Sequence, residues 1–236
     1  MDTDKLGQVI YEKALACGFD DCGIISIDDM DGFQQRLQER EEKVPSSAFF
    51  YQGMGDFANI KKRFPWAKSV IIGTYWLGKY RFVELVGYVI DQKAWCHHVP
   101  DIRPCAESCH LCQTHCPSGA LKGPFTMSPL ECVSFITTFA KGELTPGLND
   151  KNCSTWICGC DSCQDACPYN RQHDWNQGDA YPGLEELAPQ LQPEKLLAQS
   201  DTFIQEKVIP YTDYHIAADE AKTLKRCAAR SLDNQM

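Results

Sequence analysis

Hydrophobic positions in the first third of the chain follow helical spacing in some segments and strand spacing in others. Apolar residues recur at helical spacing over residues 3–16 and Gly18 follows them, which predicts an amphipathic helix ending there. A polar helix is predicted around residues 34–43. Short apolar runs predict strands at residues 22–27, 69–76 and 82–90. This part is therefore predicted to be an α/β module.

From residue 95 to residue 170, the periodicity gives way to Cys, Gly and Pro. This is typical of a region in which metal coordination rather than apolar burial fixes the backbone. Ser128-Pro-Leu-Glu131 has a capping residue, a first-turn Pro and a Glu, so it predicts a helix to about Phe139 with Cys132 in its first turn. Further helices are predicted at residues 193–199, 202–208 and 217–232.

Length and composition are ordinary for a globular protein. The 236 residues are 43% hydrophobic and 23% charged, which is enough to bury a sizeable core. No apolar run approaches the roughly 18 residues of a membrane span, and the N-terminal MDTDKLGQ has no cationic patch ahead of an apolar run. We therefore expect no membrane association and a cytoplasmic location.

Charge and cysteine content narrow the chemistry. The net charge is -9 and Lys and Arg are dispersed, which argues against sequence-independent binding of nucleic acid. Of the 14 cysteines, 11 fall between Cys96 and Cys167. In a reducing compartment, such a cluster indicates metal ligands or redox chemistry rather than a disulfide framework.

Two cysteine runs carry the strongest signal. The first is Cys105-x3-Cys109-x2-Cys112-x3-Cys116-Pro, and the second is Cys160-x2-Cys163-x3-Cys167-Pro. Each contains C-x2-C-x3-C-P, whose short spacing lets consecutive thiolates surround one 4Fe–4S cluster. In two-cluster ferredoxins the last Cys of each run binds the other cluster. The same exchange predicts two 4Fe–4S clusters here.

The exchange leaves one ligand position open. The first cluster takes Cys105, Cys109, Cys112 and Cys167. The second takes Cys116, Cys160 and Cys163, with Cys132, Cys153 and Cys158 as candidates for its fourth ligand. Cys158 is separated from Cys160 by Gly159 alone, which makes it awkward for both thiolates to reach separate irons. Cys132 is presented by the predicted capped helix.

The cysteine region resembles a known family. The stretches 131–138 and 156–170 resemble the double-cluster domain of epoxyqueuosine reductases and related corrinoid-dependent iron–sulfur proteins. Residues 18–24 and 64–72 show a less specific resemblance to the N-terminal part of that family. In the family, the Cys that heads the helix completes the second cluster, so the resemblance assigns Cys132 to it.

Two features depart from the family pattern. Three residues, rather than the commoner two, separate Cys105 from Cys109. Only 28 residues lie between Trp76 and Cys105, and the long family segment that completes corrinoid binding and supplies an acidic catalytic residue is missing near Arg81 to Phe82. We therefore expect no stoichiometric cobalamin, and we assign no catalytic residue.

Parts of the cysteine pattern also match two other kinds of metal site. A structural zinc site made of Cys109, Cys112, Cys160 and Cys163 would leave both Cys-Pro signatures unexplained. The spacing Cys105-x3-Cys109-x2-Cys112 also matches the radical-SAM signature, but those enzymes leave one iron open. Here the second run supplies an excess of thiolates.

Together these patterns predict an α/β (α+β) N-terminal module, a ferredoxin-like dicluster 4Fe–4S domain and C-terminal helices. The predicted boundaries are residues 1–94, 95–175 and 176–236. The predicted function is electron transfer by a dicluster oxidoreductase that receives electrons from a redox partner protein and passes them to a corrinoid, a corrinoid protein or another acceptor. Alternatives are a complete corrinoid-dependent reductase acting on epoxyqueuosine in tRNA, and a binding or maturation partner with structural clusters. Tight binding of tRNA is not expected.

Overall fold

The computed structural model describes most of the chain. The described residues are 2–30, 32–53, 60–76, 83–90, 92–93, 105–106, 108–124, 126–170, 182–212 and 216–235. They fall into two compact units. The first comprises Met1–Glu107 with Trp175–Ala180, and the second comprises Ser108–Asp174 with Tyr181–Met236. The predicted C-terminal helices therefore share a unit with most of the cysteine region.

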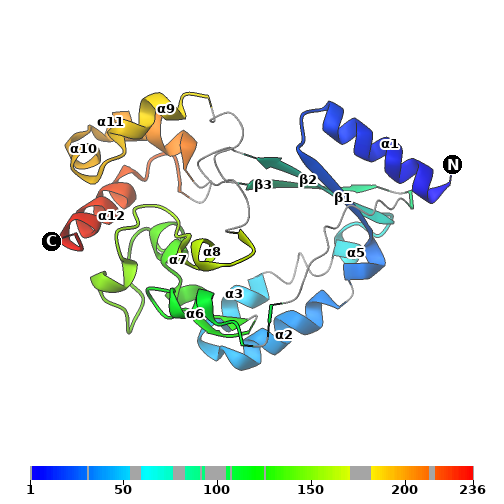
Figure 1. The fold of residues 1–236 in the computed structure, drawn as a ribbon, viewed down its shortest axis with the longest axis horizontal. Helices are drawn as coiled ribbons and strands as arrows, with labels where there is room; N and C mark the ends of the chain where they lie inside the picture. The colour runs from blue at the N-terminus through cyan, green and yellow to red at the C-terminus, as the bar shows by residue number, and fades with distance from the viewer. Residues whose placement is uncertain are drawn as a thin grey trace. The chain divides into compact units, whose positions relative to one another are not determined.

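The first unit contains a small sheet and several helices (Figure 1). Its elements are α1 (Thr3–Ala16), β1 (Asp21–Ser26), α2 (Phe33–Lys43), α3 (Ala48–Gly53), α5 (Ile60–Arg63), β2 (Ser69–Trp76) and β3 (Val83–Ile90). The predicted helices at 3–16 and 34–43 are confirmed, as are the three strands to within a residue at each end. Gly18 follows α1 with a φ of 97°, a left-handed conformation that favours glycine.

The sheet is antiparallel throughout, in the order β1-β2-β3. The module is therefore α+β. Cys22 pairs with Gly73 and Ile24 pairs with Ile71, which places these four residues on one face of the sheet, where α1 packs. Full pairing of β2 with β3, from Ser69↔Ile90 to Trp76↔Val83, leaves only residues 77–82 to connect them.

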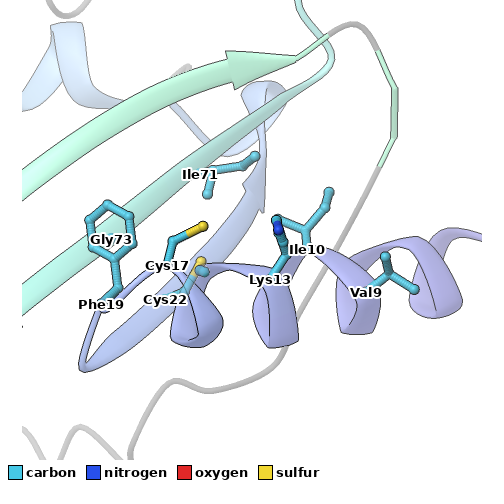
Figure 2. Close-up of a pocket in the computed structure, with 9 residues that line it drawn as sticks. Val9, Ile10, Lys13, Cys17, Phe19, Cys22, Ile71 and Gly73 are labelled. Carbon is cyan, nitrogen blue, oxygen red and sulfur yellow. The ribbon is translucent and has the colours of Figure 1, made fainter.

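A cavity of about 560 Å³ lies between α1 and this face of the sheet (Figure 2). Its lining is mainly apolar, with Lys13 as a charged member. Phe19 lies against Gly73 so closely that an added Cβ would be 2.5 Å from its ring. Glycine at position 73 is therefore required for this packing.

The second unit combines short elements around the cysteines with a helical C-terminal part. The elements around the cysteines are α6 (Leu111–Thr114), β4 (Leu121–Gly123), β5 (Thr126–Met127), α7 (Val133–Thr137) and α8 (Ser162–Ala166). The C-terminal helices are α9 (Leu184–Leu187), α10 (Pro193–Ala198), α11 (Asp201–Phe203) and α12 (Ala221–Asp233). No helix in the described part of the chain is long and apolar enough to cross a membrane.

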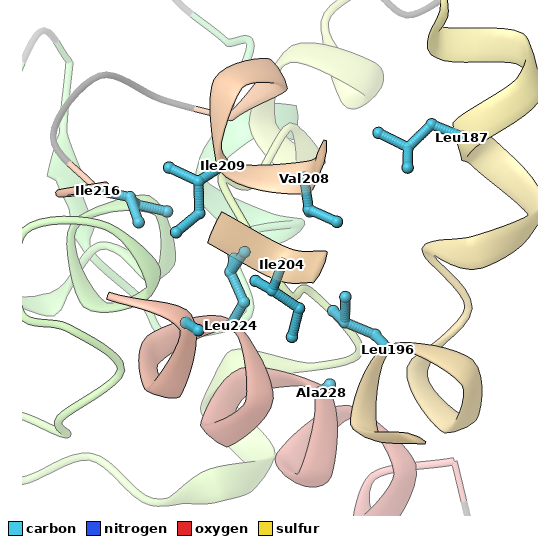
Figure 3. Packing of buried hydrophobic residues seen from close by; sticks show 9 residues of the cluster. Leu187, Leu196, Ile204, Val208, Ile209, Ile216, Leu224 and Ala228 are labelled. Atoms are coloured by element: carbon cyan, nitrogen blue, oxygen red, sulfur yellow. The ribbon is translucent and has the colours of Figure 1, made fainter. Parts of the chain in front are cut away.

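Among the described residues of this unit, the C-terminal helices enclose the largest apolar core (Figure 3). Leu196 of α10 and Leu224 of α12 are both almost fully buried and face Ile204. Ile204 begins a π-helical stretch, Ile204–Val208, that continues α11, so the helix predicted at 202–208 exists in a wider winding. The helix predicted to begin at residue 217 begins at Ala221.

The predicted continuous helix from Ser128 to Phe139 is wrong. Pro129–Glu131 form a single 3₁₀ turn, and α7 begins only at Val133. Cys132, between them, has an extended backbone with φ -70° and ψ 130°. The side chain of Ser128 makes no capping hydrogen bond, so the capping residues start a short turn rather than the longer helix. Thr138 ends α7, and the chain then turns through Lys141 and Gly142, both with positive φ.

Helix α12 is fastened to the loop that carries residues 142–155. Arg230 is 8% exposed, and its Nε donates to Asp150 Oδ1 at 2.7 Å while its Nη2 donates to the Gly142 carbonyl at 2.8 Å. Ser231 Oγ donates to the Thr155 carbonyl at 2.9 Å. Helix α12 therefore holds in place the loop segment that leads into the second cysteine run.

Replacing Arg230 with Ala should lower the free energy of unfolding by about 2–3 kcal/mol, because hydrogen bonds to a charged group are lost and a carbonyl is left without its donor. The control is Lys225→Ala, whose pair with Asp201 at 2.6 Å is partly exposed and should contribute much less to stability. Urea denaturation of the anaerobic protein measures both. Equal losses in the two variants would show that Arg230 does not fasten this loop.

Candidate iron–sulfur site

Cys132 is held at the junction of two helical turns. Its N–H donates to the Pro129 carbonyl at 3.0 Å, which closes the 3₁₀ turn, and its own carbonyl accepts from the Ile136 N–H at 3.0 Å, which opens α7. Hydrogen bonds on both sides therefore fix its backbone, and its side chain is half-buried. Cys132 is rigidly presented, as predicted, although by a junction rather than by the first turn of a long helix.

The four cysteines predicted for the second cluster are neighbours within the second unit. Burial raises the pKa of the Cys160 and Cys163 thiols, and the nearby Cys132 and Cys116 raise it further. Repulsion of this kind between thiolates disfavours the charged form of each thiol. Coordination to iron relieves it, because the metal supplies the compensating positive charge.

Cys116 lies in a polar environment that suits a thiolate. Burial disfavours the charged form, but hydrogen bonds from the backbone of Leu121, the Ser118 side chain and the backbone of Ala120 and Ser118 together place its pKa below the usual value. The Ser118 hydroxyl oxygen lies 3.7 Å from the Cys116 sulfur. Thiolates with this kind of hydrogen bonding are the ligands that iron–sulfur clusters use. The donor set therefore fits a cluster.

The turn between Cys158 and Cys160 is fixed by a buried threonine. The Gly159 N–H donates to Thr137 Oγ1 at 3.0 Å, and Thr137 is fully buried. Gly159 itself has a φ of 72°, a left-handed conformation that a side chain would strain. Helix α7 therefore positions the first cysteine of the second run through Thr137.

The cysteines predicted for the first cluster are spread over several elements. Cys112 lies in α6, Cys167 follows α8, and α6 contacts α8. The helices that carry the two runs are thus in contact, as an exchange of ligands between the runs requires. Cys109 lies in the same unit just ahead of α6, whereas Cys105 falls in the first unit.

The other two candidates for the fourth ligand pack in apolar cores, and Cys160 itself packs against the core that contains Cys153. Cys153 is fully buried in a small core with Val133 and Ile136. Cys158 packs against the core of the C-terminal helices and neighbours Cys227, whose pKa is raised to about 11 by burial. These positions favour Cys132 as the fourth ligand of the second cluster. Within the described residues, no group of three or more His, Cys, Asp or Glu side chains is placed to hold a single metal ion.

Sequence comparison identifies the cysteine region directly. Residues 105–170 match the family described as the 4Fe–4S double cluster binding domain. The chain carries a double 4Fe–4S cluster domain. Its cofactors are therefore two 4Fe–4S clusters, as the two cysteine runs predict.

Curated relatives and solved structures extend the likeness beyond this domain. An epoxyqueuosine reductase of Prochlorococcus marinus is 29% identical over 116 residues, which are 46% of this chain and 36% of that protein. One of Listeria monocytogenes is 36% identical over 90 residues, 36% of this chain and 22% of that protein. These matches span less than half the length of either relative. The chain is thus epoxyqueuosine reductase-like.

The fold agrees with that likeness. The epoxyqueuosine reductase of Bacillus subtilis, solved with its catalytic loop swung out of the active site, superposes with a TM-score of 0.72 at 19% identity. The comparison covers 98% of this chain and 82% of that one. An epoxyqueuosine reductase solved with an epoxyqueuosine-modified tRNA-Tyr stem loop gives the same TM-score at 21% identity, covering 98% of this chain and 81% of that one. The double-cluster domain therefore belongs to a chain with the epoxyqueuosine reductase fold.

Replacing Cys132 with Ala should remove one cluster, so that iron content falls by about half. Cys153→Ala and Cys158→Ala are matched controls that should retain both clusters, because their side chains pack in the cores on either side. Iron and acid-labile sulfide, counted after anaerobic purification, measure the loss. Retained iron in Cys132→Ala together with lost iron in Cys158→Ala would reassign the fourth ligand.

Proposed function

We propose that this protein is a dicluster 4Fe–4S oxidoreductase whose function is one-electron transfer. The observation that supports this most is the 4Fe–4S double cluster domain at residues 105–170, in which α6 and α8 bring the two cysteine runs into contact. Two neighbouring clusters with crossed ligands form a path for single electrons. The chain contributes the spacing of the clusters and the hydrogen bonds that tune them.

The proposed ligands are the eight cysteines of the two runs and the α7 junction. Cys105, Cys109, Cys112 and Cys167 hold the first cluster. Cys116, Cys132, Cys160 and Cys163 hold the second, in agreement with the mutual influence of their thiols. When bound, the clusters supply electron storage, while the cysteines and their hydrogen-bond donors set its potential.

The partners follow from the same proposal. Electrons come from a redox partner protein and pass to a corrinoid, a corrinoid protein or another acceptor. One epoxyqueuosine reductase with the same fold was solved with a tRNA stem loop, and tRNA is therefore a candidate substrate for this chain. The net charge of -9 and the dispersed Lys and Arg nevertheless work against tight binding by this chain alone, because each phosphate contact needs a basic group.

A complete corrinoid-dependent reductase is the second candidate, and the fold similarity over 98% of the chain favours it. Against it stands the short connection between β2 and β3, residues 77–82. Residues 77–82 include Arg81 and Phe82, the point at which the sequence lacks the family segment, and they lie outside the described part of the chain. A corrinoid needs a deep pocket and, for reduction at its cobalt, a placed proton donor.

Anaerobically purified protein should contain about eight iron and eight sulfide per chain, the content of two 4Fe–4S clusters. Reductive titration should bleach the charge-transfer absorption in one-electron steps. Zinc in place of iron would contradict the cluster assignment. Clusters that are present but cannot be reduced would contradict electron transfer and favour a structural role in a binding or maturation partner.

Titration of the anaerobic protein with cobalamin should give no saturable change in the cobalamin spectrum at micromolar concentration, because the segment that the family uses to complete the corrinoid site is missing. The positive control is an epoxyqueuosine reductase of known structure, such as that of Bacillus subtilis, titrated in parallel. A saturable one-to-one change in this chain would establish the complete reductase as its function.

A further inference from the structure

The side chains of Trp156, just ahead of the second cysteine run, and Ser162, within that run, form a series of hydrogen bonds that ends on the proposed cluster ligand Cys160. Trp156 Nε1 donates to Ser162 Oγ at 3.2 Å. The same Ser162 oxygen lies 3.5 Å from the Cys160 sulfur. All three side chains are half-buried within the second unit. The sequence singles out none of these contacts, because Ser162 and Trp156 occupy positions between the cysteines that no ligand spacing marks.

The two hydrogen bonds that link Trp156, Ser162 and Cys160 run in one direction. An indole N–H can only donate, so the Ser162 oxygen accepts from Trp156. The single hydroxyl hydrogen of Ser162 then remains for the sulfur, and a deprotonated sulfur can only accept it. The Ser162 backbone N–H also donates to Cys160. The cluster-bound form of Cys160 therefore receives two hydrogen bonds from one residue.

We propose that Ser162 is a positioning residue that raises the reduction potential of the cluster bound by Cys160, and that Trp156 holds the Ser162 hydroxyl in the donating orientation. Reduction adds negative charge that is shared with the ligand sulfurs. A hydrogen bond to such a sulfur stabilises the reduced state more than the oxidised one. The contribution of Trp156 is indirect, since its N–H both orients and polarises the hydroxyl. This inference rests on the proposed dicluster function.

The position of Ser162 supports a role in tuning. It is the first residue of α8, next to Cys163, so its backbone is held by the same helix that carries a second ligand of the cluster. Trp156 packs with the small core of Val133, Ile136 and Cys153, which fixes its ring. The Ser162 hydroxyl is therefore positioned by the Ser162 backbone in α8 and by the indole N–H of Trp156.

Ser162→Ala should shift one of the two cluster midpoint potentials to a more negative value and leave the other unchanged, as measured by an anaerobic redox titration followed by electron paramagnetic resonance. A tenfold change in the ratio of oxidised to reduced cluster at fixed potential corresponds to 59 mV for one electron. Trp156→Phe should shift the same midpoint in the same direction by a smaller amount. Ser162→Thr retains a hydroxyl and should restore the wild-type value.

Ser200→Ala is the matched control, because its hydroxyl accepts from the Phe203 N–H at the start of α11 and should not affect either potential. Unchanged potentials in fully loaded Ser162→Ala and Trp156→Phe would overturn the inference and leave the dicluster function intact. Absence of reducible clusters in the wild-type protein would instead overturn the function itself. If Ser162→Ala loads less iron, Trp156→Phe and Ser162→Thr decide the matter at full loading.

Discussion

Coordination of iron by thiolates is the interaction on which the second unit depends. The helices beside the cysteines, α6, α7 and α8, have only four or five residues each. Helices this short are not stable by themselves, because nucleation costs more than a few hydrogen bonds return. Their conformation must therefore be imposed by tertiary contacts and by the clusters, whose binding energy is also folding energy.

The protein contributes to this arrangement from outside the cysteine motifs. Helix α12 ties the loop ahead of the second run through Arg230 and Ser231, while Thr137 of α7 fixes the turn at Gly159. Burial raises the pKa of Cys160 and Cys163, so their environment favours the neutral thiol. It accommodates the thiolate form only when metal charge is present. Hydroxyl and backbone donors at Cys116 and Cys160 then provide the means to adjust potential.

The first unit has a simpler architecture, in which helix α1 packs on one face of a small antiparallel sheet. Cys22 and Ile24 contact α1, and Gly73 leaves room for the ring of Phe19. Strands β2 and β3 pair directly along their full length, from Ser69↔Ile90 to Trp76↔Val83.

The sequence alone determined the elements with clear periodicity and the class of cofactor. The helix at residues 3–16 and the strand at 69–76 follow from apolar spacing, and the two C-x2-C-x3-C-P runs indicate 4Fe–4S clusters because ligand spacing is a local property of the chain. Only the tertiary structure decided the break of the predicted helix at Cys132, since local capping signals cannot show where neighbouring turns compete. The tertiary structure alone placed Cys153 and Cys158 in apolar cores and brought Trp156, Ser162 and Cys160 within hydrogen-bond distance. These contacts depend on packing between segments rather than on residue spacing within one segment.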